Sequence, residues 1–341
     1  MRVSDRASAR NYLKYLNQAK SAYAKTNEQI ASGNRFERIS DDVSAGTRVM
    51  RTRMDLYKSQ KHLDNVQSVN EELSMAEDTM TSMQDILTNI HALTVKAASE
   101  EKGDAARSAI ANEIKSLKGQ FLSLSNSKYG QKYLFGGSNA SLTSPFEADG
   151  DGRLLYNGID VSRISQDADG YFYLDTDGSR RAIPRDENVY LDIGLGVRMK
   201  ESRVDPDTAF LVSYSGLDIM GFGTDPETGL PNNLYNLLTD LETAVRSNDQ
   251  EMLGKCDTQL TSLTDRFRAN LTDIGSKTNF LDTMETRLKS TVDSHKIRIS
   301  NLMGTDDVEA STQQTMNDYV LKAVIQMGAR ILPVSLMDFL R

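Results

Sequence analysis

The apolar and small residues of the first helix-like stretch recur at alternating intervals of three and four. They are Ala9, Tyr12, Leu16, Ala19, Tyr23, Thr26 and Ile30. This spacing predicts a helix with a narrow heptad seam on one face. Gly33 stands where a glycine commonly ends a helix. The sequence therefore predicts a terminal helix that stops near residue 33.

A much longer seam follows. Its members include Val69, Leu73, Ala76, Met80, Met83, Leu87, Ile90, Thr94 and Ala97. They predict one helix over about 43–102, about sixty residues or roughly 90 Å at 1.5 Å per residue. Gly103-Asp104 then ends this helix and begins another, which carries Ile110, Ile114, Leu117, Phe121 and Leu124. So short a connection predicts that the two helices are antiparallel neighbours.

Helical periodicity returns at Asn232 and, after a break near residue 248, continues in a second long seam. The seam consists of Leu253, Cys256, Leu260, Leu263, Phe267, Leu271, Ile274, Thr278, Leu281, Met284, Leu288, Val292, His295, Ile299 and Leu302. Gly304 stops it, and the spacing of Asp306 and Glu309 is that of a capping box. A last helix is predicted on Met316, Val320, Ala323, Met327 and Ile331, and Pro333 is expected to end it.

Between the two helical halves the pattern changes to short alternating runs. Five of the six prolines lie in residues 145–231, and Asp-Gly pairs separate strand-like segments there. "NVYLDIGLGVRM" and "FLVSYSGLDIM" read as further strands. The Asp-x-Asp-Gly repeats at 149–152, 167–170 and 175–178 also suggest calcium loops. An EF-hand loop needs Gly at its sixth position and Glu at its twelfth, and counted from Asp175 these positions hold Arg180 and Asp186. Hairpin turns are the favoured interpretation.

The predicted fold class is mainly α: a long antiparallel helical rod with a terminal N/C coiled coil and a small, mostly-β insertion domain. Residues 1–42 and 305–341 would form a discontinuous coiled-coil assembly domain. Residues 43–143 and 232–304 would form the discontinuous rod domain. Residues 144–231 would form the β-rich insertion, exposed on the outside.

The stretch "IASGNRFERISDDVSAG" at 30–46 interrupts an otherwise helical sequence. It reads as a helix stop, a packed turn and a helix start, because its two adjacent carboxylates can cap free N–H groups and favour the positive end of the next helix dipole. The residues predicted to form this helix joint are Gly33, Arg35, Ile39, Asp41 and Asp42.

The net charge of -8 is unevenly spread, since residues 1–61 hold 13 Lys and Arg against 6 Asp and Glu. These basic residues are spaced singly along a helix without interleaved aromatics, which favours a solvated helix face over a nucleic-acid site. No window is apolar enough for a membrane span. The N-terminus lacks the apolar core of a secretory signal, and its long periodicity argues against a transit peptide. Export, if it occurs, is expected without a cleavable signal peptide.

Little in the sequence points to chemistry. The three histidines, His62, His91 and His295, are far apart and lack metal-ligand spacing to Cys256, the single cysteine. No phosphate-binding or nucleophile motif is present, and the methionines on the seams read as adaptable packing. We therefore expect no catalytic residues, no metal, no cofactor and no enzyme activity.

The stretch at 30–46 resembles the junction between helix and rod in the flagellin superfamily, where a Ser-Gly-x-Arg turn precedes an Asp-Asp-x-x-x-Gly helix start. The ending "SLMDFLR" is similar to the end of the same family, so the resemblance covers roughly 1–140 and 232–341. Within the superfamily, "MRVS", "YLFGG" and "SLMDFL" are closer to hook-filament junction proteins than to filament flagellins.

The resemblance implies an extracellular structural protein of the bacterial flagellum. Its terminal helices would pair in the wall of a tube and be disordered in the free monomer, and its subunits would be exported unfolded by the flagellar type III route. Its partners would be copies of itself in a ring or helical layer, a hook-associated protein on the hook side, and a second junction protein or flagellin on the filament side. An export chaperone on the C-terminal helix is also expected, and no nucleic acid or membrane.

The residues predicted to form the assembly interface are Tyr12, Leu16, Tyr23, Ile30, Val320, Met327, Ile331, Leu336 and Phe339. Two other interpretations stay open. The chain could be a filament flagellin with a small outer domain, which is a bulk polymer of the same superfamily. It could also be an unrelated coiled-coil scaffold or signalling rod, although such a rod should carry a membrane span or a sensor domain.

Overall fold

The computed structural model describes residues 2–99, 103–138, 143–167, 170–175, 177–200 and 203–337. These residues form two compact units. We call residues up to 60 together with those from 289 onward the terminal unit, and residues 61–288 the central unit. Helices make up 66% of the structure, and the strands are short and lie between residues 128 and 233. The predicted fold class is therefore confirmed, while the predicted three-domain division stays a prediction.

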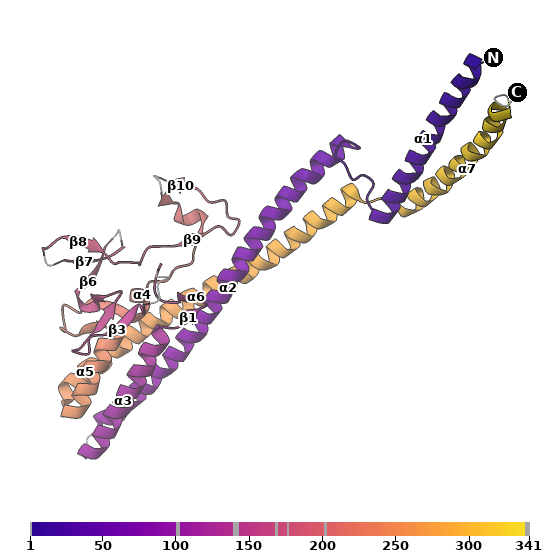
Figure 1. Ribbon diagram of the computed structural model, residues 1–341. Helices are drawn as coiled ribbons and strands as arrows, with labels where there is room; N and C mark the ends of the chain where they lie inside the picture. The colour runs from indigo at the N-terminus through magenta and orange to yellow at the C-terminus, as the bar shows by residue number, and fades with distance from the viewer. Residues whose placement is uncertain are drawn as a thin grey trace. The chain divides into compact units, whose positions relative to one another are not determined.

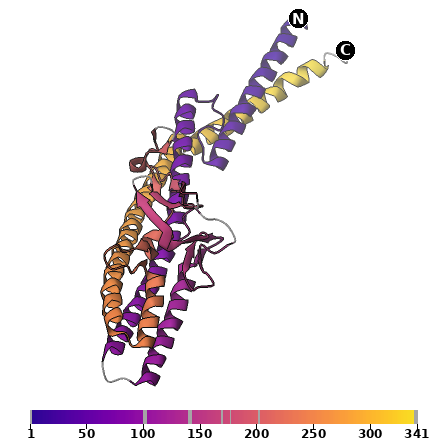
Figure 2. The same cartoon turned by 90° about the vertical axis from the view of Figure 1, so that its left-hand side faces the viewer.

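In the terminal unit, helix α1 (Arg2–Ser32) lies beside helix α7 (Asp307–Met337), as Figures 1 and 2 both show. The pair is antiparallel, since Asn317 near the start of α7 contacts Thr26 near the end of α1, and Gly328 further along α7 lies against Tyr12. The predicted pairing of the two terminal helices is confirmed.

Helix α7 departs from the prediction at its end, because it continues through Pro333 to Met337. A proline removes one backbone hydrogen bond and crowds the carbonyl four residues earlier, and this can kink a helix without stopping it. Residues 338–341 lie outside the described part of the chain.

Two long helices run through both units, α2 (Val43–Ala98) and α6 (Gln250–Met303). Helix α2 ends a few residues before the predicted position. Within the central unit the two are antiparallel, because Gln67 Nε2 donates to Glu285 Oε1 at 2.8 Å and Asn70 Nδ2 donates to Asp282 Oδ1 at 2.8 Å. The seams predicted for both helices supply most of their buried residues in this unit.

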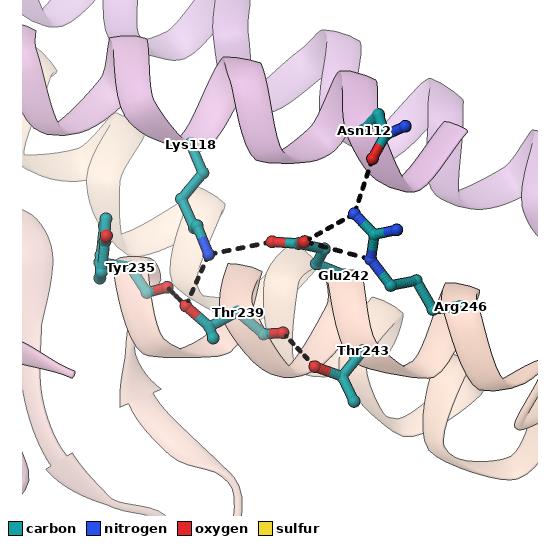
Figure 3. Close-up of polar contacts among 7 residues, drawn as sticks. All are labelled: Asn112, Lys118, Tyr235, Thr239, Glu242, Thr243 and Arg246. Carbon is teal, nitrogen blue, oxygen red and sulfur yellow. Dashed lines mark hydrogen bonds and ion pairs between the residues drawn. The ribbon is translucent and has the colours of Figure 1, made fainter. Parts of the chain in front are cut away.

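Helices α3 (Asp104–Ser125) and α5 (Leu234–Ser247) pack against each other in the central unit. A buried polar cluster joins them (Figure 3). The Lys118 ammonium lies 3.1 Å from Glu242 Oε2 and also donates to Thr239 Oγ1, and the side chains of Lys118 and Glu242 are only 10% and 13% exposed. Arg246 bridges Glu242 and Asn112. Removing one member of an ion pair so nearly excluded from water leaves the other charge unpaired and destabilises the fold. Replacing both members with apolar side chains is expected to change stability much less.

The strands form small antiparallel sheets. They are β1 (Lys128–Tyr129), β2 (Lys132–Tyr133), β3 (Phe146–Ala148), β4 (Leu154–Tyr156), β5 (Ile159–Asp160), β6 (Ile164–Asp167), β7 (Gly170–Leu174), β8 (Arg180–Ala182), β9 (Tyr190–Leu191), β10 (Met199–Lys200), β11 (Arg203–Val204), β12 (Phe210–Leu211), β13 (Gly221–Thr224) and β14 (Pro231–Asn233). Strands β3-β4-β5 and β6-β7-β8 form three-stranded sheets, and β1-β2, β9-β12, β10-β11 and β13-β14 pair alone. Single 3-10 turns occur at η1 (Val161–Arg163) and η2 (Pro206–Thr208).

The β segments from β3 to β6 share the buried core of the helices. Phe146, Leu154 and Tyr156 belong to the same buried cluster as the residues of α2, α3, α5 and α6 that face inward. The prediction was wrong at "SGLDIM", where α4 (Gly216–Met220) replaces a strand. Ser215 caps this short helix by accepting a hydrogen bond from Leu217 N at 3.2 Å, and the apolar run that resembled a strand is buried as a helix instead.

The described residues of the Asp-Gly segments agree with the hairpin interpretation: residues 150–152 and 177–178 lie in turns, and Asp167 pairs with Gly170 between β6 and β7. Asp149 Oδ1 accepts backbone hydrogen bonds from Asp151 and Arg153. Asp177 Oδ1 accepts one from Ser179. Asp167 forms an ion pair with Arg180. These carboxylates are occupied by local turn and strand contacts.

Candidate assembly site

The site built by the terminal residues is a helix pair joined to the long helices by two short connections. On α1 the least exposed side chains are those of the predicted seam, Ala9, Tyr12, Leu16, Ala19, Tyr23 and Thr26. On α7 the buried or half-buried positions that follow the same spacing are Ala310, Gln314, Asn317, Leu321, Val324 and Gly328, and Asp318 and Ala323 beside them are also half-buried. The α7 set also alternates by four and three. We call these two sets the inner seam.

The inner seam changes character along its length. Near the joint it is polar: Asn317 Nδ2 donates to Thr26 Oγ1 at 2.6 Å, and Gln314 hydrogen bonds to Asn27. Further from the joint it is apolar and tightly fitted, since a Cβ at Gly328 would overlap the phenol of Tyr12. A helix-interior glycine costs about 1 kcal/mol relative to alanine, so its place here is explained by the ring that lies over it.

The seam predicted on α7 is not the one that faces α1. Met316, Val320 and Met327 are 62%, 43% and 58% exposed. Each lies one position before an inner-seam residue, which turns it by about 100° around the helix. Apolarity alone selected the wrong register, because the packed positions include the polar Gln314 and Asn317 and a glycine. The structure therefore places Val320 and Met327 of the predicted assembly interface on a second, exposed stripe.

The other predicted interface residues divide between these surfaces. Tyr12, Leu16 and Tyr23 are half-buried on the inner seam, and Ile30 is exposed. Ile331 and Leu336 belong to α7, but their side chains are not described, and Phe339 lies outside the described residues. That these residues contact neighbouring subunits stays a prediction.

The joint holds the two connections together through the backbone. Arg35 N donates to Met303 O at 2.6 Å, and Thr305 N donates to Gly33 O at 3.0 Å. Asn34 and Gly304 form an isolated antiparallel bridge between them. Gly33 has φ of +68°, the left-handed conformation of a glycine just past a helix end. The end of α1 is thus tied to the end of α6.

Capping and packing fix the start of α2. Asp42 Oδ1 accepts from Ala45 N at 2.9 Å, and its other oxygen pairs with Arg35 at 3.0 Å. Asp41 accepts instead from Arg38 N at 3.3 Å and closes the turn. A Cβ on Gly46 would lie 3.0 Å from Ile39 Cγ2. The Asp-Asp-x-x-x-Gly pattern therefore has a structural reason: one cap, one turn, and one position without a side chain beneath Ile39.

A small apolar cluster closes the joint. Phe36, Ala45 and Val49 are buried against Ile299, Leu302 and Met303 of α6, which are half-buried. The guanidinium of Arg35 lies 5.8 Å from the centroid of the Phe36 ring. Nearby, a hydrogen bond with the Glu28 carboxyl and the charge of that group raise the pKa of the exposed Glu37. Predicted joint residues Gly33, Arg35, Ile39, Asp41 and Asp42 all lie here.

No chemistry-bearing cluster stands out among the residues that the structure describes. They include no set of three His, Cys, Asp or Glu side chains arranged to hold a metal, and their helices contain no apolar stretch that could span a membrane. Cys256 is buried, and burial raises the pKa of its thiol to about 11.

A cavity of about 540 Å³ lies in the central unit between β7, α4 and α6. Asp186 on its wall accepts hydrogen bonds from Tyr156 Oη at 2.7 Å and Ser215 Oγ at 2.9 Å, and burial raises its pKa to about 6. Asp273 pairs with Lys277 at 2.7 Å. These wall carboxylates therefore have partners within the protein, from the β region for Asp186 and from the same helix for Asp273.

Sequence reasoning missed a second exposed stripe, on the first turns of α2. Its members are Val43, Met50, Met54 and Tyr57, which are 63%, 52%, 60% and 65% exposed. Their spacing of seven, four and three is a heptad signal that the sequence contains. It was overlooked because the inner residues of α2 give the same period on the other face.

Comparison with known proteins gives three findings. Residues 3–140 match the bacterial flagellin N-terminal helical region. The flagellar hook-associated protein 3 of Escherichia coli (strain K12) is 25% identical over 274 residues, which cover 74% of this chain and 82% of that protein. A structure assigned to a flagellar hook-associated protein of Vibrio parahaemolyticus has a TM-score of 0.59 at 16% identity and covers 77% of this chain and 100% of that one. The last similarity is one of fold.

Proposed function

We propose that this chain, which belongs to the flagellin superfamily, is a structural protein of the bacterial flagellum that forms the junction between hook and filament. The observation that carries the proposal is the exposed apolar stripe on α7, beside the inner seam that already pairs α7 with α1. A helix pair that has used one seam and still exposes a second is suited to packing against further helices. The similarity of this chain to hook-associated protein 3 supports the view that these further helices belong to other subunits of a flagellum.

The mechanism would be assembly rather than catalysis. The inner seam is narrow and partly polar, so burial within one chain offsets little of the conformational entropy lost on ordering α1 and α7. Neighbouring copies would supply the remaining apolar surface. Ordering would then be coupled to polymerisation, which keeps the free subunit soluble.

The finer features follow from the same proposal. Copies of the chain would form a ring or helical layer, with a hook-associated protein on one side and a filament-side junction protein or flagellin on the other. An export chaperone would cover the C-terminal helix before assembly. The chain would act outside the cell and leave it through the flagellar channel without a cleavable signal peptide.

A clean deletion in the source organism tests the function. We expect hooks without filaments by electron microscopy, together with flagellin released into the medium. Complementation with the full chain is the control. Bare hooks without released flagellin would identify the chain as the filament subunit instead, and normal filaments in the deletion strain would refute both flagellar roles.

A further inference from the structure

The first turns of α2 carry apolar seams on two opposite faces. The inner one, Ala45, Val49 and Thr52, is buried, at 8%, 3% and 3% exposure. The outer one comprises Val43, Thr47, Met50, Met54 and Tyr57. Its members at 43, 47 and 50 lie two positions before those of the inner seam, which is about 200° around a helix. A helix with seams on opposite faces is built to lie between two neighbours.

The outer seam is also set in basic surroundings. Residues 43–60 contain Arg48, Arg51, Arg53 and Lys58 and a single acidic residue, Asp55. Met50, Arg53, Met54, Tyr57 and Lys58 together line a shallow hollow of about 400 Å³ on this face. Its occupant should therefore be a helix that offers apolar side chains in acidic surroundings.

The first half of α7 has this chemistry. Residues 305–320 contain Asp306, Asp307, Glu309 and Asp318 and no Lys or Arg. Val308, Met316 and Tyr319 are 78%, 62% and 75% exposed on the stripe that does not face α1. Within the terminal unit, α1 offers no such surface, since its charged residues are mostly basic.

We propose that the outer seam of α2 binds the acidic first half of α7 from a second copy of this chain. The two surfaces are different patches of one chain, so the contact is heterologous and repeats from copy to copy, which generates a ring or a helical layer. The inference rests on the proposed function, and it names the surfaces through which the copies would meet. Apolar contact would provide the burial, and the opposite charges would select α7 over the basic α1.

Cysteine cross-linking on isolated hook-filament particles tests the pairing. Two differently tagged copies are expressed together, one carrying Met54→Cys and the other Tyr319→Cys. Cys256 can stay, because it is buried and its thiol pKa is raised. We expect a short bismaleimide to give a product containing both tags. Val95→Cys with Tyr319→Cys is the matched control, since Val95 is 57% exposed on the same helix but outside the seam.

The other outcomes would overturn the proposal. A product joining two Met54→Cys copies would mean that the outer seam pairs with itself. A product of single-chain mass from a chain carrying both cysteines would mean that α7 folds back on its own α2. No product, with both tagged copies present in the particles, would mean that another protein covers the seam. Absence of even the unmodified chain from the particles would instead refute the proposed function.

Charge reversal provides a second readout. Lys58→Glu and Glu309→Lys should each reduce the cross-linked yield several-fold, because each weakens the attraction between the basic surroundings of the outer seam and the acidic first half of α7. An unchanged yield from both variants, with normal incorporation, would refute the contribution of charge to the contact.

Discussion

The buried pair between Lys118 and Glu242 gives a stability prediction whose size follows from the contacts in Figure 3. Replacing Lys118 with Met keeps the aliphatic bulk and leaves the Glu242 carboxylate, 13% exposed, with one fewer positive partner. Removing one member of a buried pair costs about 3–5 kcal/mol. Because Arg246 still lies 3.1 Å from this carboxylate and partly compensates its charge, we expect a loss at or just below the lower end of that range, about 2–3 kcal/mol.

Urea unfolding of the purified chain, followed by circular dichroism, measures the loss. Lys118→Met combined with Glu242→Leu removes both charges and should recover most of it. The matched control is Lys255→Met, which breaks an exposed pair with Glu251 and should cost less than about 0.5 kcal/mol. If the double variant were as unstable as Lys118→Met, the loss would come from packing of Lys118 on its neighbours, and the unpaired-charge argument would be refuted.

Three further predictions concern the seams and the cavity wall. Leu16→Asp with Val320→Asp should leave a soluble chain that is absent from isolated flagella by immunoblot, and normal incorporation would refute the seam argument. Gly328→Ala should reduce incorporation, because the added methyl group meets the phenol of Tyr12. In a Tyr12→Ala background the same substitution should have no further effect, and equal effects in both backgrounds would contradict the contact. The pKa of Asp186 is raised to about 6 from its ordinary 3.8, so the folded state holds this proton more tightly than the unfolded chain. The free energy of unfolding should therefore rise as the pH falls from about 7 to about 4, and Asp186→Asn should remove that part of the pH dependence in urea titrations.

The long helices could be predicted from the sequence because their seams repeat over many turns. Each turn of α2 and α6 repeats the same apolar spacing on the same face. The sequence therefore predicts the positions of these helices to within a few residues. The joint was also foreseeable, since Gly33 and Asp42 have local roles, a left-handed turn and a cap, that depend on few other residues. Ile39 over Gly46 could not be foreseen, because it is a contact between a turn and the next helix.

The α7 seam shows why local periodicity fails on a narrow helix pair. Where two adjacent stripes have the same period, apolarity favours the stripe with the larger side chains. The side chains of α1 determine which stripe is packed. The Tyr12 ring leaves room only for a glycine at position 328, and Thr26 Oγ1 accepts a hydrogen bond from Asn317 Nδ2. The strand predicted at 216–220 was wrong for a related reason, because a short apolar run is compatible with either a strand or one buried helical turn.

The register of the terminal pair is fixed at both of its ends, and this bears on how the outer stripe could serve assembly. A heptad seam alone permits slippage by seven residues. Near the joint, this register places the half-buried Asn317 amide where it donates to Thr26 Oγ1 and to Ala22 O, and a slip would lose both hydrogen bonds. Far from the joint, a seven-residue slip would place Tyr12 against Leu321 instead of Gly328, where the ring has no room. Since one register satisfies both contacts, the exposed residues of α7 have fixed positions relative to α1. A fixed stripe is what a repeating contact between copies requires.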